Sequence, residues 1–328
     1  MKRKRTRNSL NSEQRQQLSL SQTKSAEVIA TTDFYLPDEC WECVFRFLDN
    51  GNNNNNSSSS LKSFSAVSKQ FLSITNRLRF SITIRDPTRH CLSRLFQRFP
   101  NLTSLRLAHY FCHDRFCWIR TLASSIRMKY TQNNSVDNSN LFVVGPQLKS
   151  LHLTSSPCLR DESSIKMIAS VFPNLQLLNF SYCYNISKEG IIHVLRTCPE
   201  IKHLNLTGCL GRKLRGMNFD VPKLEVLNLS HTNVDDETLC VISKCCRGLL
   251  QLILEGCAVV TDKGVKHALE KCTQLREINL KYGPKMRGDV LASLIFSRPS
   301  LRKITIPVDY RFSHKEMELL SRQGCIVC

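Results

Sequence analysis

One pattern of hydrophobic and polar positions recurs along most of this chain: an apolar residue, two others, an apolar residue, one other, and a third apolar residue. Successive copies begin 23 to 27 residues apart, except for one gap of 46. The copies begin at Leu102, Leu148, Leu175, Ile201, Leu224, Leu249, Leu275 and Leu301. The second half of each copy alternates apolar and polar residues, which predicts a short strand. The stretches between copies have helical spacing, as in Ile191, Val194, Leu195 and Cys198, which predicts helices between the strands.

A repeat of about 20–29 residues built on this pattern is typical of a leucine-rich-repeat solenoid. The predicted fold class is therefore α/β, with a curved parallel sheet and outer helices. We expect about nine units over residues 76–310, because a degenerate unit with the strand Ile82–Ile84 precedes the first clear copy. A polar insertion near residues 131–140 accounts for the long gap, and residues 311–328 are expected to form a C-terminal cap. Such stacks of repeats present surfaces that hold other proteins.

The polar residues between the inward-pointing leucines face the concave side, which makes them the candidate surface for a protein target. Asparagine recurs at the central position of the strands, beginning with Asn179. The other candidates on the strands are His203, Asn205, Asn228 and Asn279. Residues that leave the strands form a rim, where aromatic and amphipathic side chains are favoured for recognition. The rim candidates are Tyr182, His231 and Tyr282. Two alternatives stay open: the asparagines suit a crowded sheet surface, and the rim side chains cover the edge of the solenoid.

The formal net charge of +19 makes nucleic acid an alternative partner. However, the outward strand positions carry only three basic and two acidic residues, and they are chiefly small and neutral. A groove that follows a phosphate backbone is far more basic. We therefore expect a protein target and no specific nucleic acid.

The cysteines, sixteen in all, follow the repeat. Six of them occupy two fixed repeat positions: Cys183, Cys209, Cys257, Cys198, Cys246 and Cys272. A small, weakly polar side chain fits between a strand turn and a helix end, so we predict free buried thiols in a reducing compartment. The two CxxC pairs lie at opposite ends of an elongated body, so we expect no metal site. No nucleotide-binding, esterase or zinc-protease motif is present, and we expect no catalytic residue and no cofactor.

Both ends of the chain carry short motifs with two interpretations each. Residues 1–33 have the composition of a disordered basic tail, in which Lys2–Arg5 is either a nuclear-import signal or an ordinary basic cluster. No apolar stretch approaches the about 20 residues of a membrane span, and no apolar run follows the basic start. We therefore expect a protein of the nucleus and/or cytoplasm. The last four residues fit a lipidation motif at Cys325, but residues 313–323 also predict a final helix followed by an edge strand.

Residues 34–75 differ from the repeats and predict two helices. The first begins at Leu36-Pro37, with acidic residues in its first turn and an apolar face at Val44, Phe45 and Leu48. An Asn/Ser-rich spacer, residues 50–60, precedes a second apolar stripe at the spacing of a single helix. Two helices of this size hardly form a core alone, so we expect them to pack on the solenoid or on a partner.

This segment resembles an F-box in its Leu-Pro-x-Glu start, the aliphatic residues four apart, and the Val-Ser-Lys-x-Phe of the second helix. An F-box followed by leucine-rich repeats resembles the substrate receptors of SCF (Skp–cullin–F-box) ubiquitin ligases. The resemblance implies a non-catalytic receptor whose F-box binds a Skp-type adaptor, and through it a cullin, while the repeats bind a protein to be ubiquitinated. It also implies a set of adaptor-binding and F-box core residues: Leu36, Pro37, Val44, Leu48, Leu61, Phe64, Val67 and Phe71.

Three positions depart from the F-box pattern. Phe71 stands where the family usually has Trp, Ser68 stands where it commonly has Cys, and the Asn/Ser spacer is unusually long. A longer loop costs little entropy, although it could weaken adaptor binding. The alternatives are an N-terminal cap for a free-standing repeat scaffold or inhibitor, and a nuclear protein that associates with nucleic acid.

Overall fold

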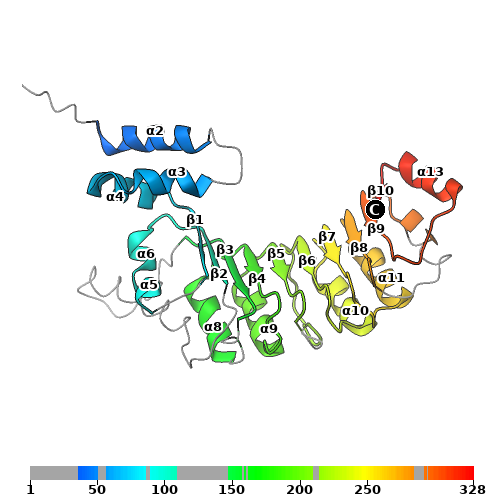
Figure 1. Cartoon of the computed structure of the whole chain (residues 1–328). Coiled ribbons are helices and arrows are strands. Elements are labelled where there is room, and N and C mark those ends of the chain that lie inside the picture. Colours follow the sequence, from blue (N-terminus) through cyan, green and yellow to red (C-terminus); the bar gives the residue numbers. More distant parts are fainter. Residues whose placement is uncertain are drawn as a thin grey trace, which may run out of the picture.

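The repeats form one continuous parallel sheet (Figure 1). The computed structural model describes residues 36–50, 57–85, 89–108, 147–156, 159, 162–209, 214–283, 292–293 and 295–328. Ten strands lie in chain order from β1 to β10, each hydrogen-bonded to the next. They are β1 Ser81–Ile84, β2 Ser104–Ala108, β3 Ser150–Thr154, β4 Leu177–Asn179, β5 His203–Asn205, β6 Val226–Asn228, β7 Gln251–Ile253, β8 Glu277–Asn279, β9 Lys303–Thr305 and β10 Ile326–Val327. The predicted strands, including the degenerate first one, are confirmed.

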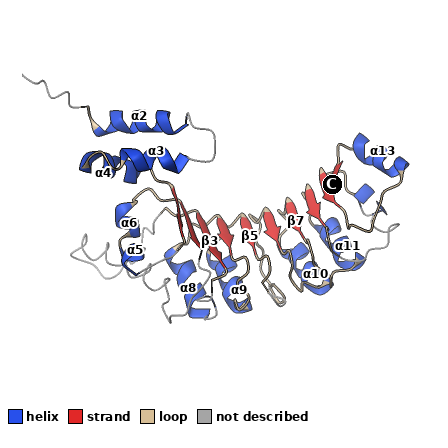
Figure 2. Ribbon diagram, in the orientation of Figure 1, coloured by secondary structure: helices blue, strands red, loops and turns tan. Residues whose placement is uncertain are grey.

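Helices cover the convex side of this sheet (Figure 2). They are α5 Arg89–Ser93, α6 Leu95–Arg98, α8 Glu162–Val171, α9 Lys188–Thr197, α10 Asp236–Cys245 and α11 Asp262–Lys271. The side chains of Ser187, Asp235 and Thr261 cap α9, α10 and α11 by accepting backbone N–H groups of the first turn. This arrangement confirms the leucine-rich-repeat solenoid that the sequence predicts.

The core of the solenoid is built from the repeated leucines, because strand pairing places them directly above one another. Leu178, Leu204, Leu227 and Leu252 are aligned partners on consecutive strands and are all buried. The side chains of each repeat therefore complete the core of the next one, as expected of a stack of repeats.

The repeated cysteines are buried, as the sequence predicts. Sγ of Cys183, Cys209 and Cys257 each donates to a backbone carbonyl of the preceding repeat, at 3.0, 3.1 and 3.0 Å. Cysteines of the second set, including Cys198 and Cys272, stand at the C-terminal caps of the helices. Burial raises the pKa of Cys183 to about 12 and that of Cys198 and Cys272 to about 11. These thiols therefore stay protonated and serve packing.

The described part of the N-terminal segment, residues 36–50 and 57–78, contains three helices, so the prediction of two is wrong. They are α2 Asp38–Asn50, α3 Ser57–Phe64 and α4 Lys69–Arg77. The predicted second helix breaks because Ser68 leaves helical geometry, and its side chain accepts the N–H of Phe71 to begin α4. We call residues 36–78 the helical module.

The helical module also has a small core of its own, contrary to the expectation that it would have to pack on the solenoid or on a partner. Phe45, Leu61, Ile74 and Leu78 are buried together, separately from the core of the repeats. The third helix makes this core possible, because it contributes Ile74. The backbone after α4 leads directly into β1, and the N–H groups of residues 103 and 104 donate to the carbonyl of Phe80.

The C-terminal cap ends the sheet with α13 His314–Arg322 and strand β10. Ser313 and Glu316 form a reciprocal capping box at the start of α13, and Gly324 follows the helix with φ of 71°. Cys325 is buried in the core of the repeats, so its thiol is inaccessible in the folded chain. The final helix and edge strand are thus confirmed.

Several sequence predictions fall on residues outside those described. They are the tail at residues 1–33 with Lys2–Arg5, and the insertion at residues 131–140. Within the described ranges, no helix has the length and apolar character needed to cross a membrane. Within the same ranges, no group of three or more His, Cys, Asp or Glu side chains is placed to hold a metal ion.

Candidate protein-interaction surfaces

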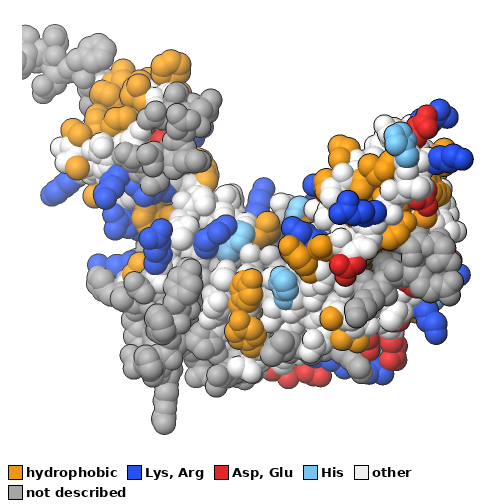
Figure 3. Space-filling view, turned by 45° about the vertical axis from the view of Figure 1, so that its right-hand side comes forward, with side chains coloured by type: hydrophobic (Ala, Val, Ile, Leu, Met, Phe, Trp, Pro, Cys, Tyr) orange, Lys and Arg blue, Asp and Glu red, His pale blue; other side chains and the backbone are white. Residues whose placement is uncertain are grey.

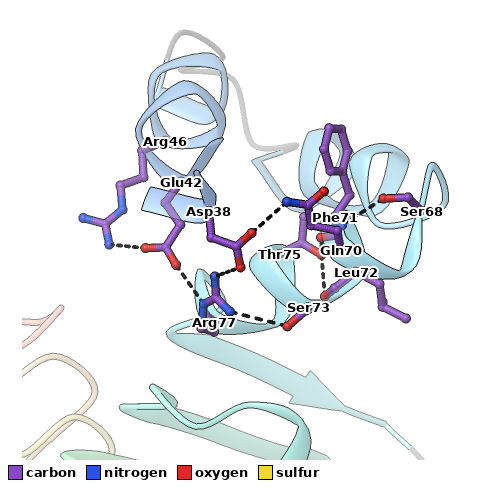
Figure 4. A network of polar contacts seen from close by, with 10 residues as sticks. All are labelled: Asp38, Glu42, Arg46, Ser68, Gln70, Phe71, Leu72, Ser73, Thr75 and Arg77. Carbon is purple, nitrogen blue, oxygen red and sulfur yellow. Dashed lines mark hydrogen bonds and ion pairs between the residues drawn. The ribbon is translucent and has the colours of Figure 1, made fainter. Parts of the chain in front are cut away.

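Arg77 ties helix α2 to helix α4 (Figure 4). Its Nη2 donates to Oδ2 of Asp38 and its Nε donates to Oε1 of Glu42, both at 2.8 Å. Nε2 of Gln70 donates to the other Asp38 oxygen at 2.8 Å. The hydrogen bonds from Arg77 and Gln70 lower the pKa of Asp38, and the bonds to Asp38 and Glu42 raise the pKa of Arg77. These contacts fix the first turns of α2 against α4.

Four aromatic rings fill the space between the helices of the module. The ring of Phe45 stacks on Phe64 at 4.7 Å between centroids and meets the edge of Phe71 at 4.9 Å. Trp41 lies 4.7 Å from Phe71 and 5.9 Å from Phe45. Trp41 and Phe45, four residues apart in the sequence, therefore pack one face of α2 against the core.

The opposite face of α2 is apolar and exposed. Phe47 is 79% exposed, Leu48 47% and Val44 39%, and the thiols of Cys40 and Cys43 lie beside them in the sequence at helical spacing. Figure 3 shows hydrophobic side chains gathered over α2 at the top of the view. We call these five residues the α2 outer face. An apolar stripe of this kind on a small module is typical of a protein interaction site.

The structure divides the predicted F-box set into two groups. Leu61, Phe64 and Phe71 pack inside the module. Val44, Leu48 and Val67 are exposed, so of the two roles predicted for the set only adaptor binding remains for them, as a prediction. Leu36 is half-buried and Pro37 exposed; the carbonyl of Pro37 accepts the N–H groups of residues 40 and 41 to begin α2.

The inward-pointing Phe45 and the exposed Phe47 were missing from the predicted set. Because both faces of α2 are apolar, spacing alone does not identify the face that packs. The acidic pair Asp38 and Glu42 offered a signal, since both lie on the packed side of α2 and meet Arg77.

The concave asparagines have a defined structural role. Oδ1 of Asn179, Asn205, Asn228 and Asn279 accepts the backbone N–H two residues further on, at 2.8 to 2.9 Å. Each bond closes the turn that follows the strand, so these residues shape the sheet edge whatever else they bind. The sequence left this role open as the alternative to ligand binding.

The rim candidates share an unusual backbone conformation. Tyr182, His231 and Tyr282 have φ of 60°, 56° and 50°, the left-handed region, and the same repeat position holds Gly208 and Gly256 with φ of 69° and 68°. A Cβ atom at Gly208 would lie 2.6 Å from the Tyr182 ring, and one at Gly256 would lie 2.3 Å from Nδ1 of His231. Each ring thus covers the turn of the next repeat, which supports the edge-covering interpretation.

The rim residues differ in how much of each side chain is exposed. Tyr282 is 60% exposed, with Nζ of Lys281 5.0 Å from its ring centroid, and Tyr182 is 42% exposed. His203 is exposed on β5. The structure therefore brings the candidates to one side of the solenoid but spreads them over the strands from β4 to β8, without gathering them into one pocket.

Charge is unevenly distributed along the concave face. The outward positions of the described strands β1 to β6 contain no Asp or Glu, whereas β7 and β8 contribute Glu255, just past the strand, and Glu277. These two carboxylates accept hydrogen bonds from Asn279 at 3.2 Å and Gln251 at 3.1 Å. Figure 3 shows the surface hollowed between the helical module and the C-terminal cap.

Comparison with known families identifies the helical module. The F-box domain family matches residues 34–83, which covers helices α2, α3 and α4 and all of β1 except its last residue. The chain combines this domain with leucine-rich repeats and is therefore an F-box/leucine-rich-repeat protein.

Curated relatives agree with this architecture. F-box/LRR-repeat protein 4 of Bos taurus is 26% identical over 61% of this chain and 34% of its own length. F-box/LRR-repeat protein 12 of Arabidopsis thaliana is 27% identical over 57% of this chain and 44% of its own length. The SCF E3 ubiquitin ligase complex F-box protein pof2 of Schizosaccharomyces pombe is 30% identical over 24% and 17%. The chain thus spans less than half the length of these relatives.

Among solved structures, the chain aligns with one from the crystal structure of the yeast Rad7 and Elc1 complex. The alignment covers 98% of each chain, with 14% identity and a TM-score of 0.49. The family assignment rests on the F-box match, the curated relatives and the repeats themselves.

Proposed function

We propose that this protein is the substrate-recognition subunit of an SCF-type ubiquitin ligase. In this proposal the α2 outer face binds a Skp-type adaptor, which connects the chain to a cullin, and the repeats hold the protein target. The chain supplies binding and orientation only. Holding the target beside a ubiquitin-charged enzyme raises the effective concentration of the two reactants.

The observation that carries the proposal is the exposure of the α2 outer face within a domain that matches the F-box family. Phe47 keeps most of its surface in contact with water and Leu48 about half, although the core of the module lies on the other side of the same helix. The Asp38–Arg77 and Glu42–Arg77 contacts hold α2 so that this face stays outward. A partner that covers the face gains roughly 25 cal/mol for each Å² of apolar surface removed from water.

The test is the affinity of the full chain for a purified Skp-type adaptor, measured by isothermal titration calorimetry. We expect Leu48→Asp to weaken binding about 30-fold or more, which corresponds to about 2 kcal/mol at a buried contact. Val259→Asp is the matched control, because Val259 is also 47% exposed but lies between β7 and α11 in the repeats. Equal affinities of the two variants would refute the assignment of the adaptor site to α2.

Capture of a cullin tests the next step. The tagged wild-type chain should bring down adaptor and cullin together from cells, and the Leu48→Asp chain should bring down neither. If the wild-type chain captures no adaptor, the protein is a repeat scaffold and the helical module is only its cap.

A further inference from the structure

The turn-closing role of the asparagines fixes which end of each side-chain amide remains for a ligand. Because Oδ1 already accepts a backbone N–H, the amide cannot be reversed without losing that bond, and Nδ2 is the remaining donor. Nδ2 of Asn179 lies 3.5 Å from Nδ1 of His152. Within the described part of the chain, Nδ2 of Asn205 and of Asn228 meet no hydrogen-bond acceptor.

Strand pairing aligns these donors in one row. Arg106, His152, Asn179, Asn205 and Asn228 are successive register partners on β2, β3, β4, β5 and β6. Neighbouring strands lie about 4.8 Å apart, so the row extends across about 20 Å of the concave face. We call these five residues the donor row. Arg106 and the three asparagines carry side-chain N–H donors, whereas the ring nitrogens of His152 lie 3.1 Å from Oγ of Ser150 and 3.5 Å from Nδ2 of Asn179. No member carries a carboxylate.

Charge around the donor row favours an anionic ligand. The outward positions of β1 to β6 contain no acidic residue, and the exposed His203 lies on β5 beside the row. The carboxylates of Glu255 and Glu277 lie beyond the row and are occupied by the amides of Asn279 and Gln251. The row itself contains one arginine, which is too little positive charge for a groove that follows a nucleic-acid backbone.

We propose that the donor row binds an acidic peptide segment of the protein target, through carboxylate or phosphate oxygens that accept from Arg106 and from the Nδ2 groups of the asparagines. This inference rests on the proposed function, because it names the class of target that the repeats would present. The open amides of Asn205 and Asn228 gain acceptors, and Arg106 at one end gains an anionic partner. Hydrogen bonds of this kind to charged oxygens are stronger than those between neutral groups.

Asn205→Asp separates ligand binding from folding. An aspartate oxygen can still accept the N–H and hydroxyl of Thr207, so the turn is kept, but the donor becomes a negatively charged acceptor. Asn218→Asp is the matched control, because it makes the same change at an exposed site whose Oδ1 lies 3.5 Å from Nη2 of Arg196 on the convex helix α9.

The experiment selects binders from a displayed library of random 12-residue peptides on the full-length chain. We expect peptides enriched in Asp and Glu, and fluorescence anisotropy should show at least tenfold weaker binding of the best peptide to Asn205→Asp, but no change with Asn218→Asp. Replacing the acidic residues by phosphoserine distinguishes the two sources of anionic oxygen: tighter binding indicates a phosphorylated target, and weaker binding indicates carboxylates.

Four results would overturn the inference: no selected peptide, a selected set without acidic enrichment, unchanged binding to Asn205→Asp, or a single-stranded oligonucleotide that outcompetes the peptides. Adaptor affinity of the same variants is measured in parallel. Intact adaptor binding with a failed peptide selection refutes this inference alone, whereas absent adaptor binding refutes the proposed function.

Discussion

Phe45→Ala should unfold the helical module and leave the repeats folded. Phe45 is 2% exposed, in a small core whose other buried hydrophobic side chains, among the described residues, are Leu61, Ile74 and Leu78. The substitution removes the stacked contact with Phe64 and the edge contact with Phe71. Replacing a buried Phe by Ala typically costs about 3–5 kcal/mol of unfolding free energy.

That loss is comparable to the whole stability of the module. At about 0.05–0.15 kcal/mol per residue, a unit of this size has roughly 2–6 kcal/mol to lose. The core of the repeats is a separate cluster, so it keeps its own contacts. Phe47→Ala, two residues away on the same helix, is the control, because Phe47 is 79% exposed and its loss should change stability by less than about 0.5 kcal/mol.

Hydrogen exchange followed by mass spectrometry distinguishes the two regions. In the Phe45→Ala chain, amides of residues 38–78 should exchange at the rate of an unfolded chain, whereas strands β4 to β8 should keep wild-type protection. In the Phe47→Ala chain, both regions should be protected. Uniform loss of protection along the Phe45→Ala chain, or full protection of residues 38–78, would refute the separation of the two cores.

Three further predictions concern the repeats. Gly256→Ala should destabilise the chain by about 2–3 kcal/mol, because φ is 68° and the new Cβ would approach Nδ1 of His231 to 2.3 Å. In a His231→Ala background, where the ring is gone, chemical denaturation should show a loss of only about 1–2 kcal/mol for the same substitution. Asn228→Ala should cost about 1–2 kcal/mol in the same assay, because the N–H of Ser230 loses its acceptor at 2.9 Å, whereas Asn228→Asp should cost less; equal losses would contradict the turn-closing role. Burial raises the pKa of the Cys272 thiol to about 11, above its usual value of 9.0. The buried thiol therefore adds its full contribution to stability below a pH of about 9, and that contribution is lost as the pH rises towards 11. Denaturation of wild type and Cys272→Ala at pH 8 and pH 10.5 should show the difference between them shrinking at high pH.

Much of the solenoid is predictable from sequence because each repeat must bury the same positions. Inward-pointing leucines at fixed spacing indicate the strands, and Ser187 and Thr261 indicate where helices begin. The same phase accounts for the buried cysteines. Repetition supplies several independent copies of one signal, which is why even the degenerate strand Ser81–Ile84 could be predicted.

The helical module is harder to predict than the repeats because its sequence pattern occurs only once in the chain. Apolar spacing of three and four continues across the break between α3 and α4, and in the sequence only the N-cap residue Ser68 marks where α4 begins. Both faces of α2 are apolar, so the choice between Phe45 and Phe47 as the buried ring depends on where α4 places Arg77.

The sequence predicts which residues lie on the concave face and its rim, but only part of the structural role of those residues. Asparagine at a concave position is visible in the sequence, but its bond to the N–H two residues on depends on the turn geometry. The left-handed φ of Tyr182 had one signal in the sequence, since glycine occupies the same repeat position at Gly208 and Gly256. That exchange of glycine with Tyr or His is the mark of a strained turn.

The most direct test of the central claim is calorimetric titration of the full wild-type chain with a purified Skp-type adaptor. The account predicts a one-to-one complex with a Kd below about 1 μM, which corresponds to about −8 kcal/mol, and loss of measurable binding in Phe47→Asp. A folded wild-type chain that gives no binding heat and no co-elution with the adaptor would contradict it.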